Sequence, residues 1–167
     1  KQIAHDISEI NENTKAYIGE LFPGIFQKNI EHIYTSFPER KIRRDRVEIG
    51  GKNAKELEDE LVKNGINISY YTKDILRSKD FITSKSLKEV GLVKLRVADL
   101  GLTGNPTTDQ IYKRAKKLGL KLCPAEVGPH YRLKYTNQPM NERICVGMKQ
   151  IAESGDELDV FQLAHTD

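Results

Sequence analysis

A helix with both ends marked by sequence signals is the feature that most constrains the fold of this chain. It lies within the segment 99–133, DLGLTGNPTTDQIYKRAKKLGLKLCPAEVGPHYRL. Pro106 predicts a turn, because proline disfavours a helical conformation in the residue before it. Thr107 follows, with Gln110 three residues later, which is the spacing of a capping box. We therefore expect a helix over residues 108–118 that begins at a Thr107 cap.

Apolar and polar residues alternate on both sides of this helix. The alternation in 93–97, with Lys94 and Arg96 at the polar positions, predicts a strand with one face in water. Alternation in 120–122 predicts a short half-buried strand, and it resumes at 130–135 after a loop that contains two prolines. The sequence thus predicts that strands flank the capped helix.

The string TTDQIYKRAKKLGLKLCPAEVGPHYRL, together with the segment 50–76, resembles a group of bacterial hypothetical proteins that carry similar strings. The resemblance covers roughly residues 38 to 167. It implies relatedness to bacterial proteins, and it implies no mechanism and no catalytic residue.

The N-terminal region has a different pattern from the rest of the chain. Apolar residues between Ile3 and Leu21 recur at spacings of three and four, as in a short heptad seam. A second helix is expected from Ile25 to a stop near Pro38. Together they predict a helical hairpin over residues 1–38, either packed on the body or serving as a dimerising arm.

The body is expected to span residues 39–167. Asn53 and Ser69 are placed to cap two further helices, which would end near Asn64 and Arg77. Strands are expected at 143–151 and 157–165. The predicted class is α+β: the helical hairpin followed by a mostly antiparallel sheet with inserted helices. Because the chain starts at Lys1, it can be a piece of a longer protein, and the body can be truncated at its C-terminus.

Composition limits the class of protein. The chain has 167 residues and a net charge of +3, which suits one domain with an appendage and gives only a mildly basic surface. It has no apolar run of membrane-spanning length and no signal peptide, so we expect a cytoplasmic protein without a membrane partner. Cys123 and Cys145 lack metal-binding spacing and are expected to be unpaired thiols in strands.

Cys123, Glu126 and His130 are the weak catalytic candidates of this sequence. A thiol nucleophile needs a base within hydrogen-bond reach, and the proline-containing loop could bring these three together. The alternative is structural: a buried Cys123, a surface Glu126 and a His130 at a strand edge.

No cofactor or metal is expected from the sequence. Its histidines are scattered without HxH or HxxxH pairs. A composite site of His130, His165 and Asp167 would form only if the segments that carry these residues were neighbours.

Two clusters of positive charge are candidates for binding nucleic acid. The run 40–46 holds five basic residues in seven, and the predicted 108–118 helix adds a second group. The residues concerned are Arg40, Lys41, Arg43, Arg44, Arg46, Lys113, Lys116 and Lys117. The alternative is a solvated charged face that neighbouring carboxylates partly neutralise.

The sequence favours a non-catalytic interaction or regulatory module that binds a protein partner. One alternative is a nucleic-acid-binding module that uses 40–46 and the 108–118 helix. Another is a hydrolase or nuclease that uses His130 with a carboxylate. A pocket that gathers His130 and a carboxylate would favour the enzyme.

Overall fold

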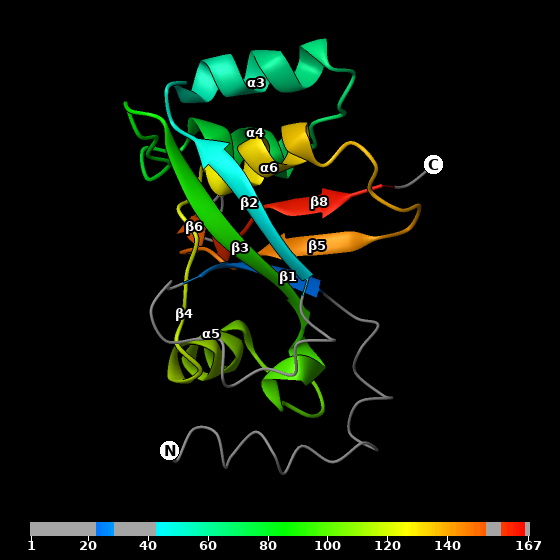
Figure 1. Ribbon diagram of the computed structural model, residues 1–167. Helices are drawn as coiled ribbons and strands as arrows, with labels where there is room; N and C mark the ends of the chain where they lie inside the picture. The colour runs from blue at the N-terminus through cyan, green and yellow to red at the C-terminus, as the bar shows by residue number, and fades with distance from the viewer. Residues whose placement is uncertain (1–22, 29–42, 153–157, 166–167) are drawn as a thin grey trace.

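A six-stranded mixed sheet forms the centre of the molecule (Figure 1). The computed structural model describes residues 23–28, 43–152 and 158–165. In spatial order, the strands are β2 (Arg43–Ile49), β3 (Lys88–Arg96), β1 (Pro23–Lys28), β5 (Arg143–Val146) and β8 (Gln162–Ala164), and β4 (Leu120–Lys121) also pairs with β1. The β1–β5 pairing is parallel and the other pairings in this sheet are antiparallel. A separate antiparallel pair is formed by β6 (Ile151–Ala152) and β7 (Leu158–Asp159).

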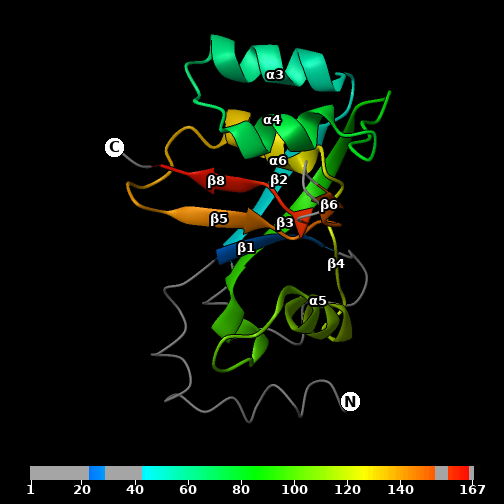
Figure 2. The same ribbon diagram turned by 180° about the vertical axis from the view of Figure 1, so that it is seen from behind.

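Helices cover both sides of the sheet, as Figures 1 and 2 show from opposite directions. On one side lie α3 (Ala54–Lys63), α4 (Tyr70–Arg77) and α6 (Val127–Lys134). On the other lie the 3-10 turn η2 (Val97–Leu100) and α5 (Thr108–Lys117). The α+β class predicted from the sequence is therefore confirmed, with a mostly antiparallel sheet and inserted helices.

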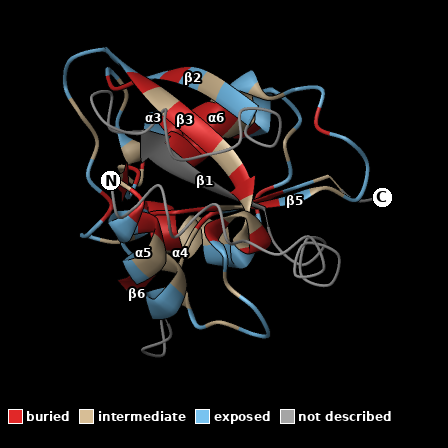
Figure 3. Cartoon of the chain, turned by 60° about the horizontal axis from the view of Figure 1, so that its bottom comes forward, coloured by how far each residue is buried: buried red, intermediate tan, exposed pale blue. Residues whose placement is uncertain are grey.

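Two apolar cores lie on opposite faces of the sheet, and β3 contributes to both. Val90 and Leu92 belong to the larger core under α3, α4 and α6, whereas Val93 and Leu95 belong to the smaller core over α5. Figure 3 shows β3 buried over much of its length. The predicted wet face is therefore wrong: the side chain of Lys94 is only 12% exposed, and its ion pair with Glu142 offsets part of the cost of burying the charge.

The predicted caps are confirmed. Thr107 Oγ1 accepts a hydrogen bond from Gln110 N–H at 3.3 Å, and Gln110 Oε1 accepts one from Thr107 N–H at 2.8 Å. Asn53 forms the same reciprocal box with Glu56 at the start of α3. At the start of α4, Ser69 Oγ accepts a hydrogen bond from Thr72 N–H.

The expected strand at 130–135 is wrong, because most of it lies in helix α6. Two features of the sequence explain why the pattern did not predict a helix. Pro129 lies in the first helical turn, where a missing N–H costs no helical hydrogen bond. The buried residues of α6 are consecutive from Val127 to Tyr131, so no polar stripe marks a helical period.

The N-terminal prediction is corrected in one place. The second hairpin helix was expected to begin at Ile25, but 23–28 is strand β1, whose backbone pairs with β3, β4 and β5. The rest of the predicted hairpin lies outside the described residues. The division between residues 38 and 39 stays a prediction, although β1 on its N-terminal side belongs to the sheet of the body.

None of the helices within 43–152 combines the length and the apolar content that crossing a membrane requires.

Candidate functional site

Glu126 is almost completely buried at the start of α6, with 1% of its surface exposed. Its carboxylate accepts hydrogen bonds from Ser84 Oγ at 2.6 Å and from Ser84 N–H at 3.1 Å. The expected surface position of Glu126 is therefore wrong. Hydrogen bonds to both the backbone and the side chain of Ser84 compensate for part of the cost of burying this polar group.

His130 lies one helical turn after Glu126, and its Nε2 is 4.0 Å from Glu126 Oε2. The expected position at a strand edge is wrong, since His130 is 9% exposed within α6. Its Nε2 is buried without a hydrogen-bond partner among the described residues. Burial lowers the pKa of His130, the charge of Glu126 opposes that shift, and Lys52 adds to it.

Cys123 and Glu126 line one small cavity of about 260 Å³, together with Ser84 and Lys149. His130 does not line this cavity, although it neighbours Glu126 on the helix. The structure thus brings the three catalytic candidates near one another, but only two of them line this cavity. A catalytic role for Cys123, Glu126 and His130 remains a hypothesis.

The remaining predicted ligand residues occupy separate positions. No disulfide joins Cys123 and Cys145, and burial raises the pKa of Cys145 on β5 to about 11. His165 Nδ1 lies 2.5 Å from the carbonyl oxygen of Gln138. Asp167 lies outside the described residues, and within them no three metal-ligating side chains form a group that could hold an ion.

The predicted basic residues are divided between β2 and α5, which occupy different parts of the molecule (Figures 1 and 3). Those on β2 are the exposed Arg43, Arg44 and Arg46, and those on α5 are the exposed Lys113, Lys116 and Lys117. Arg40 and Lys41 lie outside the described residues. Arg46 also pairs with Glu89 at 3.1 Å, so nearby carboxylates reduce the positive charge of β2.

Strand β2 is one edge of the sheet. At Arg46, charged side chains form hydrogen bonds with the outward backbone N–H and C=O groups. The N–H of Arg46 donates to Asp45 Oδ1 at 2.7 Å, and the Lys134 ammonium donates to the carbonyl oxygen of Arg46. Tyr131 Oη also donates to Asp45 Oδ2 at 3.0 Å. The first two bonds occupy the outward N–H and C=O of Arg46, which an added strand would need.

Strand β8 is the opposite edge, and its ladder with β5 shows which backbone groups point inward. Val146 N–H donates to the carbonyl oxygen of Phe161 at 2.9 Å. His165 N–H donates to the carbonyl oxygen of Glu142 at 3.2 Å. Hydrogen-bonded positions alternate along an antiparallel pair, so odd-numbered residues from 161 to 165 direct their backbone groups toward β5.

The even-numbered residues of β8 are Gln162 and Ala164, and their N–H and C=O groups point away from β5. No other described residue forms a hydrogen bond with these four groups. Strand β8 lies between β5 on one side and helices α4 and α6 on the other (Figures 1 and 2). Its open backbone edge therefore faces the helices.

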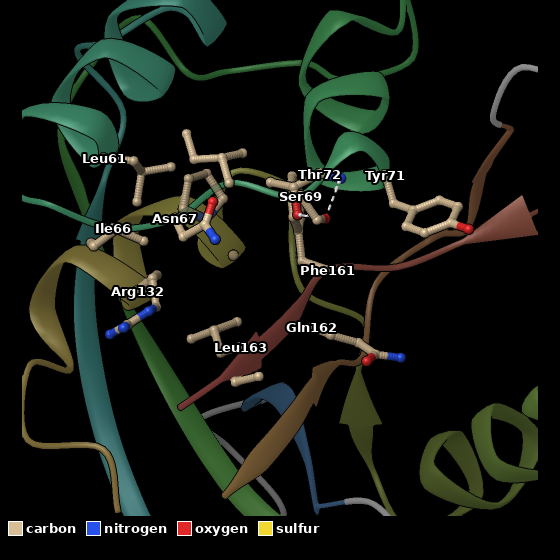
Figure 4. Close-up of a pocket in the computed structure, with 14 residues that line it drawn as sticks. Leu61, Ile66, Asn67, Ser69, Tyr71, Thr72, Arg132, Phe161, Gln162 and Leu163 are labelled. Carbon is tan, nitrogen blue, oxygen red and sulfur yellow. Dashed lines mark hydrogen bonds between the residues drawn. The ribbon is translucent and has the colours of Figure 1, made fainter. Parts of the chain in front are cut away.

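A groove of about 310 Å³ runs along this edge, as Figure 4 shows. Its walls come from the end of α3, the loop and first turn of α4, helix α6 and the residues of β8. Apolar side chains dominate the lining, among them Leu61, Ile66, Ile68, Pro129, Phe161 and Leu163. The groove therefore offers backbone hydrogen bonds beside an apolar pocket.

Within the described part of the chain, Arg132 is the one charged side chain that lines this groove. Its Nη1 donates to the carbonyl oxygen of Tyr135 at 3.1 Å. In Figure 4, Arg132 lies on the opposite side of Leu163 from Tyr71 and Gln162. One end of the groove is thus cationic and the other carries an exposed tyrosine, 58% exposed.

The groove was not predicted from the sequence. Its wall residues come from four separate segments between Leu61 and Ala164, and none of these segments contains a recognisable motif. The nearest available signal was the predicted strand at 157–165, since a short strand late in the chain is a candidate edge.

Comparisons of this chain with protein-family models, with curated proteins and with solved structures find no match.

Proposed function

We propose that this protein is an interaction module that binds an extended segment of a partner protein along the edge of β8. The observation that carries the proposal is the row of open backbone groups at Gln162 and Ala164 beside an apolar groove. In this mode of recognition, main-chain hydrogen bonds supply affinity and side-chain pockets supply specificity. The proposal agrees with the protein-partner hypothesis favoured by the sequence.

Register determines which partner side chain enters the groove. The side chains of Leu163 and Phe161 point into the larger core, roughly perpendicular to the outward backbone groups of β8. A partner residue opposite Leu163 would point to the same face, because neighbouring residues across a sheet share a face. That residue should be apolar, while the residues before and after it point toward solvent.

The first test uses a random decapeptide library displayed on phage, selected against the immobilised protein. Ala164→Pro removes one outward N–H and leaves the inward ladder to β5 intact, and proline is tolerated on edge strands. Selected peptides should bind this variant about tenfold more weakly, since one hydrogen bond is lost and a peptide carbonyl is left unpaired. Ala164→Ser keeps the N–H and is the matched control.

Gln162→Pro provides a second variant at the other open position, and thermal unfolding verifies that each variant folds. Enriched peptides that bind both proline variants as tightly as the parent protein would overturn the proposal. So would a selection that enriches no peptide. A dimer that both proline variants abolish, detected by analytical ultracentrifugation, would show that a second copy occupies the edge instead.

A further inference from the structure

We infer that the partner segment carries an acidic residue two positions from its apolar anchor, and that Arg132 recognises this residue. The inference rests on the proposed strand addition at β8. It specifies the chemical class of the ligand. An antiparallel partner strand would have the order acidic–x–apolar, and a parallel one would have the order apolar–x–acidic.

The first argument is the charge of the groove. Among the described residues that line the groove, Arg132 is the sole charged side chain and none carries a carboxylate. A guanidinium has five N–H donors, of which one is engaged by the carbonyl oxygen of Tyr135. That bond holds the side chain in one orientation and leaves donors for a carboxylate.

The second argument is spacing. Gly128 packs against Phe161 so closely that an added Cβ would lie 2.5 Å from the aromatic ring. Arg132 follows one helical turn later, a rise of about 6 Å. Two residues along a strand span about 6.6 Å. The side chain of Arg132 is therefore displaced along β8 from Phe161 toward the end of the strand, as Figure 4 shows.

The third argument is alternation. If a partner residue opposite Leu163 fills the apolar pocket, the next residue on the same face lies opposite His165, at the end of the groove near Arg132. Side chains on one face of a strand are two residues apart. An acidic side chain at that position faces the cation, whereas an acidic side chain one residue away would point to the opposite face.

The test compares three synthetic peptides, Thr-Glu-Thr-Leu-Thr-Thr and its analogues with Gln or Lys in place of Glu, by fluorescence polarisation. The Glu peptide should bind about fivefold more tightly than the Gln peptide, and the Lys peptide should bind most weakly. Arg132→Gln should abolish this preference while binding of the Gln peptide persists. Arg132→Lys should retain part of it.

Lys116→Gln on α5 is the matched control, because it removes one exposed positive charge from the other side of the sheet. Its preference for the Glu peptide should equal that of the parent protein. Equal binding of all three peptides, or a preference that survives Arg132→Gln, would overturn the inference and leave the proposed strand addition standing. Failure of every peptide to bind would count against both.

Discussion

At the β2 edge of the sheet, the N–H and C=O of Arg46 are occupied by the side chains of Asp45 and Lys134. At the β8 edge, the same groups of Gln162 and Ala164 meet a groove instead. The β2 strand has seven residues, and three of them are exposed arginines. The β8 strand has three residues and no charged side chain.

Under the proposed function, the two edges have different roles. An exposed edge strand is a template for pairing with other chains, and charged side chains suppress that pairing. The longer β2 edge carries three exposed arginines, and its backbone is protected at Arg46. The short β8 edge carries no charged side chain and lies beside apolar walls, an arrangement that would suit the proposed strand addition.

Helix α6 contributes side chains at both the β2 edge and the β8 edge. The last turns of α6 carry Tyr131 and Lys134 to Asp45 on β2. Another side of α6 carries Gly128 and Arg132 to the groove along β8. The position of α6 therefore sets the protection of one edge and the width of the groove at the other, so changes in α6 test the comparison directly.

The largest effect is expected from Gly128→Ala. The new Cβ would lie 2.5 Å from Phe161 Cδ2 and 2.8 Å from Phe161 Cβ, so α6 and β8 must move apart. We expect the free energy of unfolding to fall by about 2–3 kcal/mol, as in other overpacked cores. Urea denaturation measures it, and Phe161→Leu in the same chain should restore part of the loss. Unchanged stability would show that the contact is not tight.

Asp45→Ala should open the β2 edge. It removes the acceptor of Arg46 N–H, of Tyr131 Oη and of the Lys134 ammonium. Because Asp45 is partly exposed, we expect a loss of about 1–2 kcal/mol rather than the full cost of three bonds. Denaturation gives the loss, and ultracentrifugation should reveal new self-association. Asp45→Asn, which keeps an acceptor, should lose less.

The pKa of Asp45 offers a check on that interpretation. Burial would raise this pKa, but hydrogen bonds from Lys134, Arg46 N–H and Tyr131 outweigh it and lower the pKa below 3.8. The contribution of Asp45 to stability is therefore present above pH 3.8 and is lost as the pH falls further.

Thr107→Ala should destabilise the protein by about 1 kcal/mol without altering either edge. The capping box at the start of α5 lies on the other side of the sheet from α6. Loss of an N-cap typically has this magnitude. Denaturation measures the loss, and peptide binding at β8 should be unchanged. A weaker binding constant would mean that the edges respond to general destabilisation.

The smallest effect concerns His130, which lies in α6 between the contacts to the two edges. Its pKa in the folded protein is lower than the ordinary value of 6.5, with burial as the main cause. The unfolded chain therefore binds more protons just below pH 6.5, and stability should decline as the pH falls through that value. His130→Gln should flatten the decline in a pH series of melting temperatures. A parallel decline in the variant would assign it to other groups.

Local signals in the sequence predicted the elements that short-range chemistry controls. Thr107, Asn53 and Ser69 form their caps because each cap needs only a side chain and a backbone N–H three residues away. Helix α6 was missed because its burial on several sides removes the polar stripe that marks a surface helix.

The candidate site depended on information that the sequence does not hold locally. The sequence analysis expected a proline-containing loop to bring Glu126 and His130 together, whereas helix α6 places them one turn apart. Burial of Glu126 was missed, since its partner Ser84 lies 42 residues earlier in the chain. The groove depends on strand order, because only that order makes β8 an edge that faces α4 and α6.

Amide hydrogen exchange followed by NMR tests the comparison of the two edges most directly. In the free protein, the amides of Gln162 and Ala164 should exchange rapidly, whereas that of Leu163 between them should be protected by its bond toward β5. The amide of Arg46 should exchange slowly, since Asp45 accepts its hydrogen bond. Protection of Gln162 and Ala164 equal to that of Leu163 would show that the β8 edge is already covered, and would contradict the account.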